Sequence, residues 1–210
     1  MTRASKYDAK AQRWTEREYA DARGYLAHRA RLVVELGPRL EPGDRVLDLA
    51  CGDGGLGEHL RARGLVYVGA DSSLPMVEAA RRRLGDGTEI LHGDLNELAP
   101  ANPVAATTCF RAIYYARDRA AFFRHVAAFT EKKLVFDLNP RQYPLDAVRA
   151  DLGRAGFDRV ELRPFFAPQR VSPPAALGAV LRVAEAVGPV ARLALRFRFS
   201  YLVAAARTRS

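Results

Sequence analysis

Three glycines and one acid form the clearest chemical pattern in this sequence of 210 residues. The stretch VLDLACGDGGLG, residues 46–57, contains G-x-G-x-x-G at Gly52, Gly54 and Gly57, and Asp71 follows about 20 residues after the first of them. Glycines at this spacing let a backbone turn approach a nucleotide closely, and an acid at that distance suits ribose hydroxyl groups. The pattern therefore indicates a nucleoside-containing ligand, and a dinucleotide is the first candidate.

Asp48 argues against a dinucleotide. It stands at the end of a short apolar strand, four residues before Gly52, where a dinucleotide would place its pyrophosphate at the following helix start. A buried carboxylate would repel two phosphates, whereas it would attract a cationic ligand. S-adenosylmethionine carries a positive amino group and a positive sulfonium, and its carboxylate can use free backbone N–H groups at the helix start. The charges favour this ligand.

Three motifs, in order, resemble those of class I S-adenosylmethionine-dependent methyltransferases. Residues 48–54, DLACGDG, resemble the first motif, acid-x-Gly-x-Gly-x-Gly, with Ala50 in place of the first glycine. Residues 69–73, GADSS, resemble the second motif, and residues 92–95, HGDL, resemble the third. The resemblance covers roughly residues 40–165, because the motifs and the elements around them lie in this range. It implies that S-adenosylmethionine is the cofactor.

The resemblance also implies residue roles. Asp71 would accept both ribose hydroxyls, Asp94 would accept the adenine amino group, and the backbone N–H of Leu95 would meet a ring nitrogen. The helix start at residues 73–76 would pack under the adenine, and Phe110 and Arg111 would touch the cofactor or border the acceptor. The predicted cofactor-binding residues are Asp48, Ala50, Cys51, Gly52, Gly54, Asp71, Ser72, Met76, Gly93, Asp94, Leu95, Phe110 and Arg111.

The catalytic residue stays open at this point. Methyl transfer is an in-line displacement in which the protein aligns the acceptor and excludes water, and a base is needed only for a protonated acceptor. The candidates are Arg111, Tyr115, Arg141 and His28. Arg141 could hold an acidic group of the acceptor as a fork, or lie in solvent. We expect no metal, because the four histidines are dispersed and residues 109–111 contain no carboxylate.

Strands and helices must alternate to bring these residues together. Strands are predicted at Arg45–Leu49, Val66–Ala70, Thr88–Leu91, Val104–Phe110, Leu134–Leu138, Val160–Arg163 and Phe197–Ala205. Helices are predicted at Gly54–Arg63, Ser73–Leu84, Asp118–Phe129 and Leu145–Ala155. The pattern predicts an α/β fold, Rossmann-like and doubly wound. Its seven-stranded, mostly parallel sheet would have an antiparallel last strand and helices on both faces.

The chain is short enough to form a single domain, residues 1–210, with four segments. Residues 1–40 are predicted to form a helical lid, in which Tyr7, Trp14, Tyr19 and Tyr25 cover the cofactor or pack between helices. Residues 41–165 would be the cofactor-binding core, 166–195 a helical insertion and 196–206 the last strand. We expect the helix after Pro174 to pack in the core or line the acceptor pocket, in preference to resting on a membrane surface.

The composition and the polar N-terminus predict which partners and which compartment the protein has. The net charge of +9 comes mostly from scattered arginines, so we expect solvated helix faces and no nucleic-acid partner. The polar N-terminus and the lack of apolar runs of ~18 residues predict a cytoplasmic protein without a membrane span, and leave peripheral membrane contact and the oligomeric state open. Cys51 and Cys109 are predicted to be reduced thiols.

The sequence thus predicts methyl transfer from S-adenosylmethionine to a small-molecule acceptor of natural-product, lipid-like or quinone-like character. Two alternatives belong to other classes. One is an NAD-dependent oxidoreductase, which Asp48 and Asp94 disfavour. The other is a non-catalytic binding protein that keeps the methyltransferase scaffold.

Overall fold

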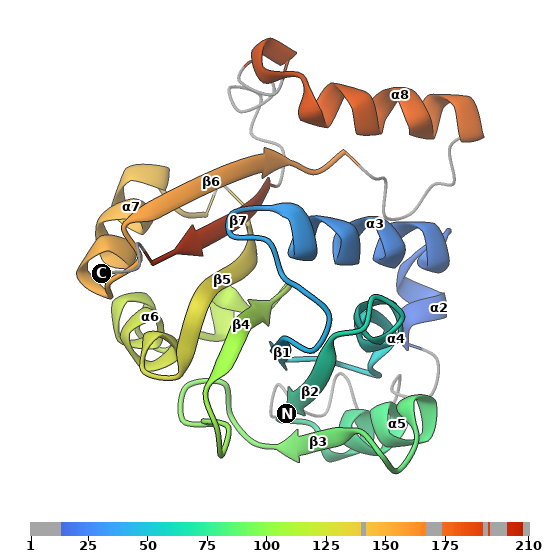
Figure 1. Cartoon of the computed structure of the whole chain (residues 1–210), viewed down its shortest axis with the longest axis vertical. Helices are drawn as coiled ribbons and strands as arrows, with labels where there is room; N and C mark the ends of the chain where they lie inside the picture. Colours follow the sequence, from blue (N-terminus) through green and yellow to red (C-terminus); the bar gives the residue numbers. More distant parts are fainter. Residues whose placement is uncertain (1–13, 140–141, 167–173, 191–192, 194–200, 208–210) are drawn as a thin grey trace.

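A computed structural model describes residues 14–139, 142–166, 174–190, 193 and 201–207. Within these residues, seven strands form one sheet in the order β3-β2-β1-β4-β5-β7-β6 (Figure 1). The strands are β1 Arg45–Leu49, β2 Val66–Asp71, β3 Glu89–His92, β4 Val104–Cys109, β5 Thr130–Leu138, β6 Arg159–Pro164 and β7 Tyr201–Ala206. Neighbours from β3 to β5 pair parallel, and β7 pairs antiparallel with both β5 and β6. The predicted sheet is confirmed.

Helices cover both faces of the sheet. The helices are α2 Trp14–Glu18, α3 Ala22–Glu35, α4 Gly55–Arg61, α5 Leu74–Leu84, α6 Arg119–Ala127, α7 Leu145–Arg154 and α8 Ala175–Ala186, with a short 3₁₀ helix η2 at Ile113–Tyr115. One apolar cluster joins α3, α4 and α5 to the sheet, and a second joins α6 and α7 to the opposite face. Val46 packs in the first cluster, whereas Leu47 and Leu49 pack in the second. Because side chains alternate along a strand, Asp48 faces α3, α4 and α5.

Strand β5 begins four residues earlier than predicted, at Thr130 instead of Leu134. The first half of the strand was not predicted, because Glu131, Lys132 and Lys133 are polar and do not resemble a buried strand. Lys133 is fully buried, and its Nζ donates to the carbonyl oxygens of Val34 (3.1 Å) and Leu36 (2.6 Å) at the end of α3. A tertiary partner thus makes a lysine acceptable in a central strand.

Helix α8 contradicts the preference for core packing or pocket lining. Leu177, Val180 and Val183 are largely exposed, and none of the described residues of α8 lines the cavity described below. Its one buried side chain of note is Glu185, which is held by His28 of α3. None of the described helices is long and apolar enough to cross a membrane. Residues 196–200 of the predicted last strand lie outside the described residues.

Candidate active site

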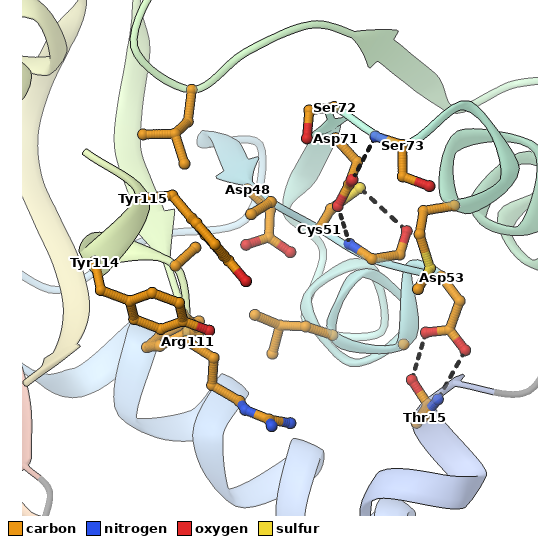
Figure 2. Close-up of a pocket in the computed structure, with 18 of the residues that line it drawn as sticks. Thr15, Asp48, Cys51, Asp53, Asp71, Ser72, Ser73, Arg111, Tyr114 and Tyr115 are labelled. Atoms are coloured by element: carbon orange, nitrogen blue, oxygen red, sulfur yellow. Dashed lines mark hydrogen bonds between the residues drawn. The ribbon is translucent and has the colours of Figure 1, made fainter. Parts of the chain in front are cut away.

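A cavity of about 360 Å³ opens at the carboxyl ends of β1, β2 and β4, where ligands bind in open parallel sheets. Figure 2 shows side chains from these strand ends and from η2 around it. The predicted cofactor-binding residues that line it are Asp48, Ala50, Cys51, Gly52, Asp71, Ser72, Met76, Asp94, Leu95, Phe110 and Arg111. Gly54 and Gly93 are not among the lining residues. Of the catalytic candidates, Arg111 and Tyr115 line the cavity, His28 does not, and Arg141 lies outside the described residues.

The turn after β1 has left-handed backbone conformations at three positions. Ala50 has φ 59°, Gly52 has φ 59° and Gly54 has φ 78°. An alanine in this region is strained by roughly 1 kcal/mol relative to glycine, because its Cβ crowds the following carbonyl. Ala50 therefore occupies the position where the first motif usually has glycine and accepts the associated strain.

The second and third glycines of the pattern serve packing. A Cβ on Gly54 would lie 2.9 Å from the Leu84 side chain, and a Cβ on Gly57 would lie 2.8 Å from the ring of Tyr67. The space at Gly57 lets the Tyr67 ring pass under α4, so that its hydroxyl donates to Asp48 Oδ2 at 2.9 Å. Gly57 thus helps to position the first acid without facing the cavity.

Asp48 is a buried carboxylate with two hydroxyl donors. Tyr67 donates to one oxygen, and the Thr108 hydroxyl donates to the other at 2.6 Å. Burial raises the pKa of Asp48 to about 6, although the Thr108 and Tyr67 hydroxyls and the charge of Arg29 oppose the shift. At neutral pH this position carries a negative charge that has little water around it.

Asp71, the last residue of β2, accepts backbone N–H groups on both oxygens. Gly52 donates to Oδ2 and Ser73 donates to Oδ1, each at 2.9 Å. Burial raises the pKa of Asp71, and the bonds from Ser73 and Gly52 oppose the shift. The Ser72 backbone N–H also bonds to this carboxylate. Together the three backbone bonds fix the orientation of Asp71, which lines the cavity (Figure 2).

Asp94 is held differently, by side chains at the surface. Burial raises its pKa, but the backbone and side chain of Asn96 and the guanidinium of Arg117 outweigh this and lower the pKa overall. Asn96 donates to Oδ1 from its backbone (2.8 Å) and side chain (2.6 Å), and Arg117 contacts Oδ2 at 2.9 Å. Asn96 and Arg117 also line the cavity, and the sequence analysis missed both.

Arg29 is the most important residue that the sequence analysis missed. It lies on the buried face of α3, lines the cavity, and is surrounded by aromatic rings: its guanidinium carbon is 4.4 Å from the ring centroid of Phe110 and 4.9 Å from that of Tyr25. It donates to the Tyr25 hydroxyl at 2.9 Å and lies 3.4 Å from Asp137. Its buried Nε has no hydrogen-bond partner within the described structure. Its position among apolar residues on one face of the N-terminal helix is the feature of the sequence that could have identified it.

Arg111 and the η2 tyrosines form the opposite wall. Arg111 has φ 55°, and its backbone N–H donates to Asp137 Oδ1 at 2.6 Å, which holds the strained turn. Its side chain pairs with Glu18 of α2 at 3.2 Å. The rings of Tyr114 and Tyr115 lie 4.4 Å apart between centroids, and Figure 2 shows both beside the cavity. This wall is aromatic and carries one cation.

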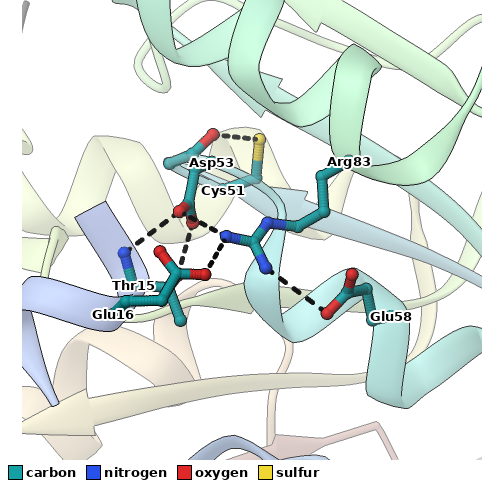
Figure 3. A network of polar contacts seen from close by, with 7 residues as sticks. Thr15, Glu16, Cys51, Asp53, Glu58 and Arg83 are labelled. Atoms are coloured by element: carbon teal, nitrogen blue, oxygen red, sulfur yellow. Dashed lines mark hydrogen bonds and ion pairs between the residues drawn. The ribbon is translucent and has the colours of Figure 1, made fainter. Parts of the chain in front are cut away.

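A buried network attaches α2 to the glycine turn (Figure 3). Asp53 accepts the Thr15 backbone N–H at 3.0 Å and the Thr15 hydroxyl, and Arg83 of α5 lies 2.9 Å from the same carboxylate. Arg83 also contacts Glu16 at 2.8 Å and Glu58 at 3.5 Å. Arg83 therefore links α2, α4 and α5, so the expectation that the arginines lie on solvated helix faces is wrong for this residue.

The remaining candidates are placed away from the chemistry or are inert. His28 Nε2 lies 2.6 Å from the carboxylate of Glu185, which accepts its hydrogen bond, and the His28 ring stacks on Phe165. Burial raises the pKa of Cys51 and of Cys109, so both stay protonated thiols. Within the described part of the chain, no cluster of three or more His, Cys, Asp or Glu side chains could hold a metal ion.

Comparison with known proteins identifies the domain type. Residues 46–133 match the family model of a methyltransferase domain. A Mycobacterium tuberculosis protein, described as a probable fatty acid methyltransferase, is 35% identical over 74 residues, which are 33% of this chain and 17% of that protein. The demethylmenaquinone methyltransferase of Clavibacter sepedonicus is 45% identical over 58 residues, 27% of this chain and 24% of that protein. The matches thus span less than a quarter of these relatives.

Solved structures extend the likeness over most of the chain. Magnesium protoporphyrin IX methyltransferase from Synechocystis, crystallised with bound S-adenosylmethionine, superposes with a TM-score of 0.61 over 90% of this chain and 83% of its own, at 21% identity. At this identity the likeness shows the fold. The resemblance predicted from the three motifs is confirmed: the chain carries a methyltransferase domain with the fold of the class I S-adenosylmethionine-dependent methyltransferases.

Proposed function

We propose that the protein transfers a methyl group from S-adenosylmethionine to a small, lipid-like or quinone-like acceptor. The observation that carries the proposal is the convergence of Asp48, Asp71 and Asp94, from three successive strand ends, on one cavity beside the glycine turn. Each acid faces a different part of that cavity and is oriented by its own donors. The bound cofactor supplies the methyl group and the sulfide leaving group.

The nucleoside would be held by the second and third acids. Asp71 lines the cavity as a carboxylate that backbone N–H groups hold in place, and a carboxylate can accept both hydroxyls of a ribose diol. Asp94 lies beyond it on the same side, next to Leu95, and suits the amino group and ring nitrogen of adenine. Met76, buried at the start of α5, offers an apolar surface for the base.

The amino-acid tail would lie between Asp48 and Arg29. The tail is a zwitterion, so it needs an anion and a cation a short distance apart. Arg29 and Asp48 both line the cavity, and the charge of Arg29 lowers the pKa of Asp48. The unpartnered Nε of Arg29 provides a donor for the tail carboxylate, and Asp48 provides the counter-charge for the amino group. Arg29 thus takes the role that we had expected of backbone N–H groups alone.

The acceptor would occupy the aromatic wall. Tyr19, Phe110, Tyr114 and Tyr115 line this part of the cavity together with Leu26. Such a surface favours a flat or aliphatic molecule over a highly charged one. The names of two relatives mention a fatty acid and demethylmenaquinone, which have this character. Arg111 and Tyr115 are the residues that we propose to orient the acceptor.

Helix α2 would act as the lid. It contacts the glycine turn through Thr15 and Asp53, and the acceptor wall through Glu18 and Arg111. These two connections close the cavity over both ligands and exclude water from the reacting atoms. We do not propose His28 as a base, because Glu185 occupies its Nε2 outside the cavity lining.

Calorimetry tests the cofactor. S-adenosylhomocysteine should bind, and NAD(H) should not; the reverse result would favour the oxidoreductase alternative. Asp71→Ala should lower the affinity for S-adenosylhomocysteine by about 100-fold, because hydrogen bonds to a charged group contribute about 1.5–3 kcal/mol. The exposed Asp86→Ala is the matched control.

Radiolabel transfer tests the acceptor. Methyl-labelled cofactor should label demethylmenaquinone-type or unsaturated fatty acyl compounds in a lipid extract. Cofactor binding without any labelled product, across lipid and aqueous extracts, would support the non-catalytic alternative.

A further inference from the structure

Helix α8 presents apolar side chains to solvent. Val180 and Val183 are each 63% exposed and Leu177 is 49% exposed. Val187, Val190 and Leu193 continue the exposed apolar surface beyond the end of the helix. In Figure 1, α8 lies at the margin of the molecule, alongside α3 and beyond β6. Single exposed apolar residues are ordinary, but Leu177, Val180 and Val183 recur every three residues along one side of α8 and form an exposed apolar face.

The orientation of α8 is held by a buried acid on its opposite side. Glu185 is 2% exposed; its Oε2 lies 2.6 Å from His28 Nε2, and its Oε1 accepts the Phe166 backbone N–H at 2.6 Å. Leu181, four residues before Glu185 and therefore on the same side of the helix, is half-buried. The anchor therefore keeps the valines pointing outward.

The charges of this surface are of one sign. In the described residues 174–190, the charged side chains are Arg182, which is exposed, and Glu185, which is buried against His28. The whole chain carries a net charge of +9. An apolar helix face with a cation at its border and no exposed acid in this range fits a surface that is apolar inside and negative at its rim.

We infer that the exposed face of α8, with Val180 and Val183 at its centre, docks on a lipid bilayer that contains anionic lipids. The valines enter the acyl boundary and Arg182 meets the headgroups. A second copy of the chain fits less well: a helix of 12 residues is about 18 Å long, and one face of it offers far less than the about 800 Å² per partner of a stable interface. The inference does not depend on the identity of the acceptor.

Vesicle sedimentation tests this surface with the full chain. The protein should sediment with vesicles of phosphatidylglycerol and phosphatidylcholine, and less with phosphatidylcholine alone. Val180→Asp/Val183→Asp should weaken binding by on the order of 100-fold, because two buried apolar side chains are lost. Arg182→Ala should weaken it by about fivefold, and only when anionic lipid is present.

The matched control is Val66→Asp, which alters an exposed valine (45%) on β2, away from α8. It should leave vesicle binding unchanged, and thermal melting should show that each variant folds. In Val183→Trp, the added tryptophan should be quenched by brominated lipid, and the unaltered chain, which contains only Trp14, gives the background quenching.

Three results would overturn the inference: equal vesicle binding by the Asp double variant, no bromolipid quenching, or a concentration-dependent dimer that the same double variant abolishes. The last result would assign the face to a second copy. None of these readouts uses methyl transfer or cofactor binding, so failure of the proposed function leaves the test intact.

Discussion

The two halves of the cavity are built in different ways. In the cofactor half, Asp71 is oriented by backbone N–H groups of Gly52 and Ser73, from a neighbouring turn and its own helix start. In the acceptor half, Arg111 is held by a side chain that is distant in the chain: Arg111 and Glu18 are 93 positions apart. The orientation of Asp71 thus depends on backbone geometry, whereas that of Arg111 depends on a side-chain pair. Substitutions in the second half should therefore change specificity and the lid more readily than they change the fold.

Asp48→Asn should have the largest effect, because Asp48 joins both halves. We expect cofactor affinity to fall by about 100-fold at pH 8, through loss of a charge-assisted contact. We also expect the ligand-free variant to be more stable. Titration calorimetry and thermal melting measure the two effects, and Asp86→Asn is the control. A variant that loses stability without losing affinity would place the cofactor elsewhere.

The pH dependence of that stability gain has a definite sign. The pKa of Asp48 is raised in the folded state, from 3.8 to about 6, so the ionised form disfavours folding. This cost is absent below pH 3.8, grows as pH rises, and is complete above about pH 6, where it amounts to roughly 3 kcal/mol. The gain from Asp48→Asn should therefore be large at pH 8 and small at pH 4. In the wild type, cofactor affinity should fall as pH drops below about 6, and in the variant it should not.

Arg29→Met should lower the affinity for the cofactor by about 30-fold. The substitution removes the proposed partner of the tail carboxylate while it keeps a side chain of similar length. It should also raise the pKa of Asp48, because Arg29 lowers that pKa now. The acid limb of the affinity–pH profile would then move to higher pH. Arg31→Met, on the exposed side of the same helix, should do neither. An unchanged profile would contradict the proposed role of Arg29 beside Asp48.

Thr15→Val tests the lid. The change removes the hydroxyl bond to Asp53 and keeps the backbone bond and the shape. We expect cofactor release to become about fivefold faster, because the loss of one hydrogen bond costs about 1 kcal/mol. Stopped-flow fluorescence measures the release rate. Thr88→Val removes a hydroxyl bond to Leu84, away from the cavity, and should leave release unchanged. Equal release rates in both variants would mean that α2 does not gate the site.

Ala50→Gly should have the smallest effect and the opposite direction. Glycine relieves the left-handed strain at φ 59°, and we expect a gain of about 1 kcal/mol in unfolding free energy. Ala62→Gly, at an ordinary helical conformation, should instead lose about 0.5–1 kcal/mol. If both substitutions lower the free energy of unfolding, the strain at Ala50 is already offset by the packing of its side chain.

The motif residues were predictable because their roles are local. A strand, a glycine turn and a helix start place Asp48 and Asp71 wherever the chain adopts this fold, so their positions in the sequence are enough. Asp53 and Arg83 were missed, since each looked like an ordinary turn or helix-end residue. Their meeting with Thr15 joins three segments, and no spacing along the chain encodes that.

Hydrophobic periodicity and turn chemistry act over short ranges, so the sequence alone was enough to predict the alternation of strands and helices, the antiparallel last strand and the acids at the strand ends. Which polar residues become internal depends instead on the folded chain. It buried Lys133 against the end of α3 and enclosed Arg29 in aromatic rings, while it turned the valines of α8 to the solvent. The physical reason is that the burial of a charge or of an apolar face depends on the partner that the fold brings to it, and that partner is distant in the chain.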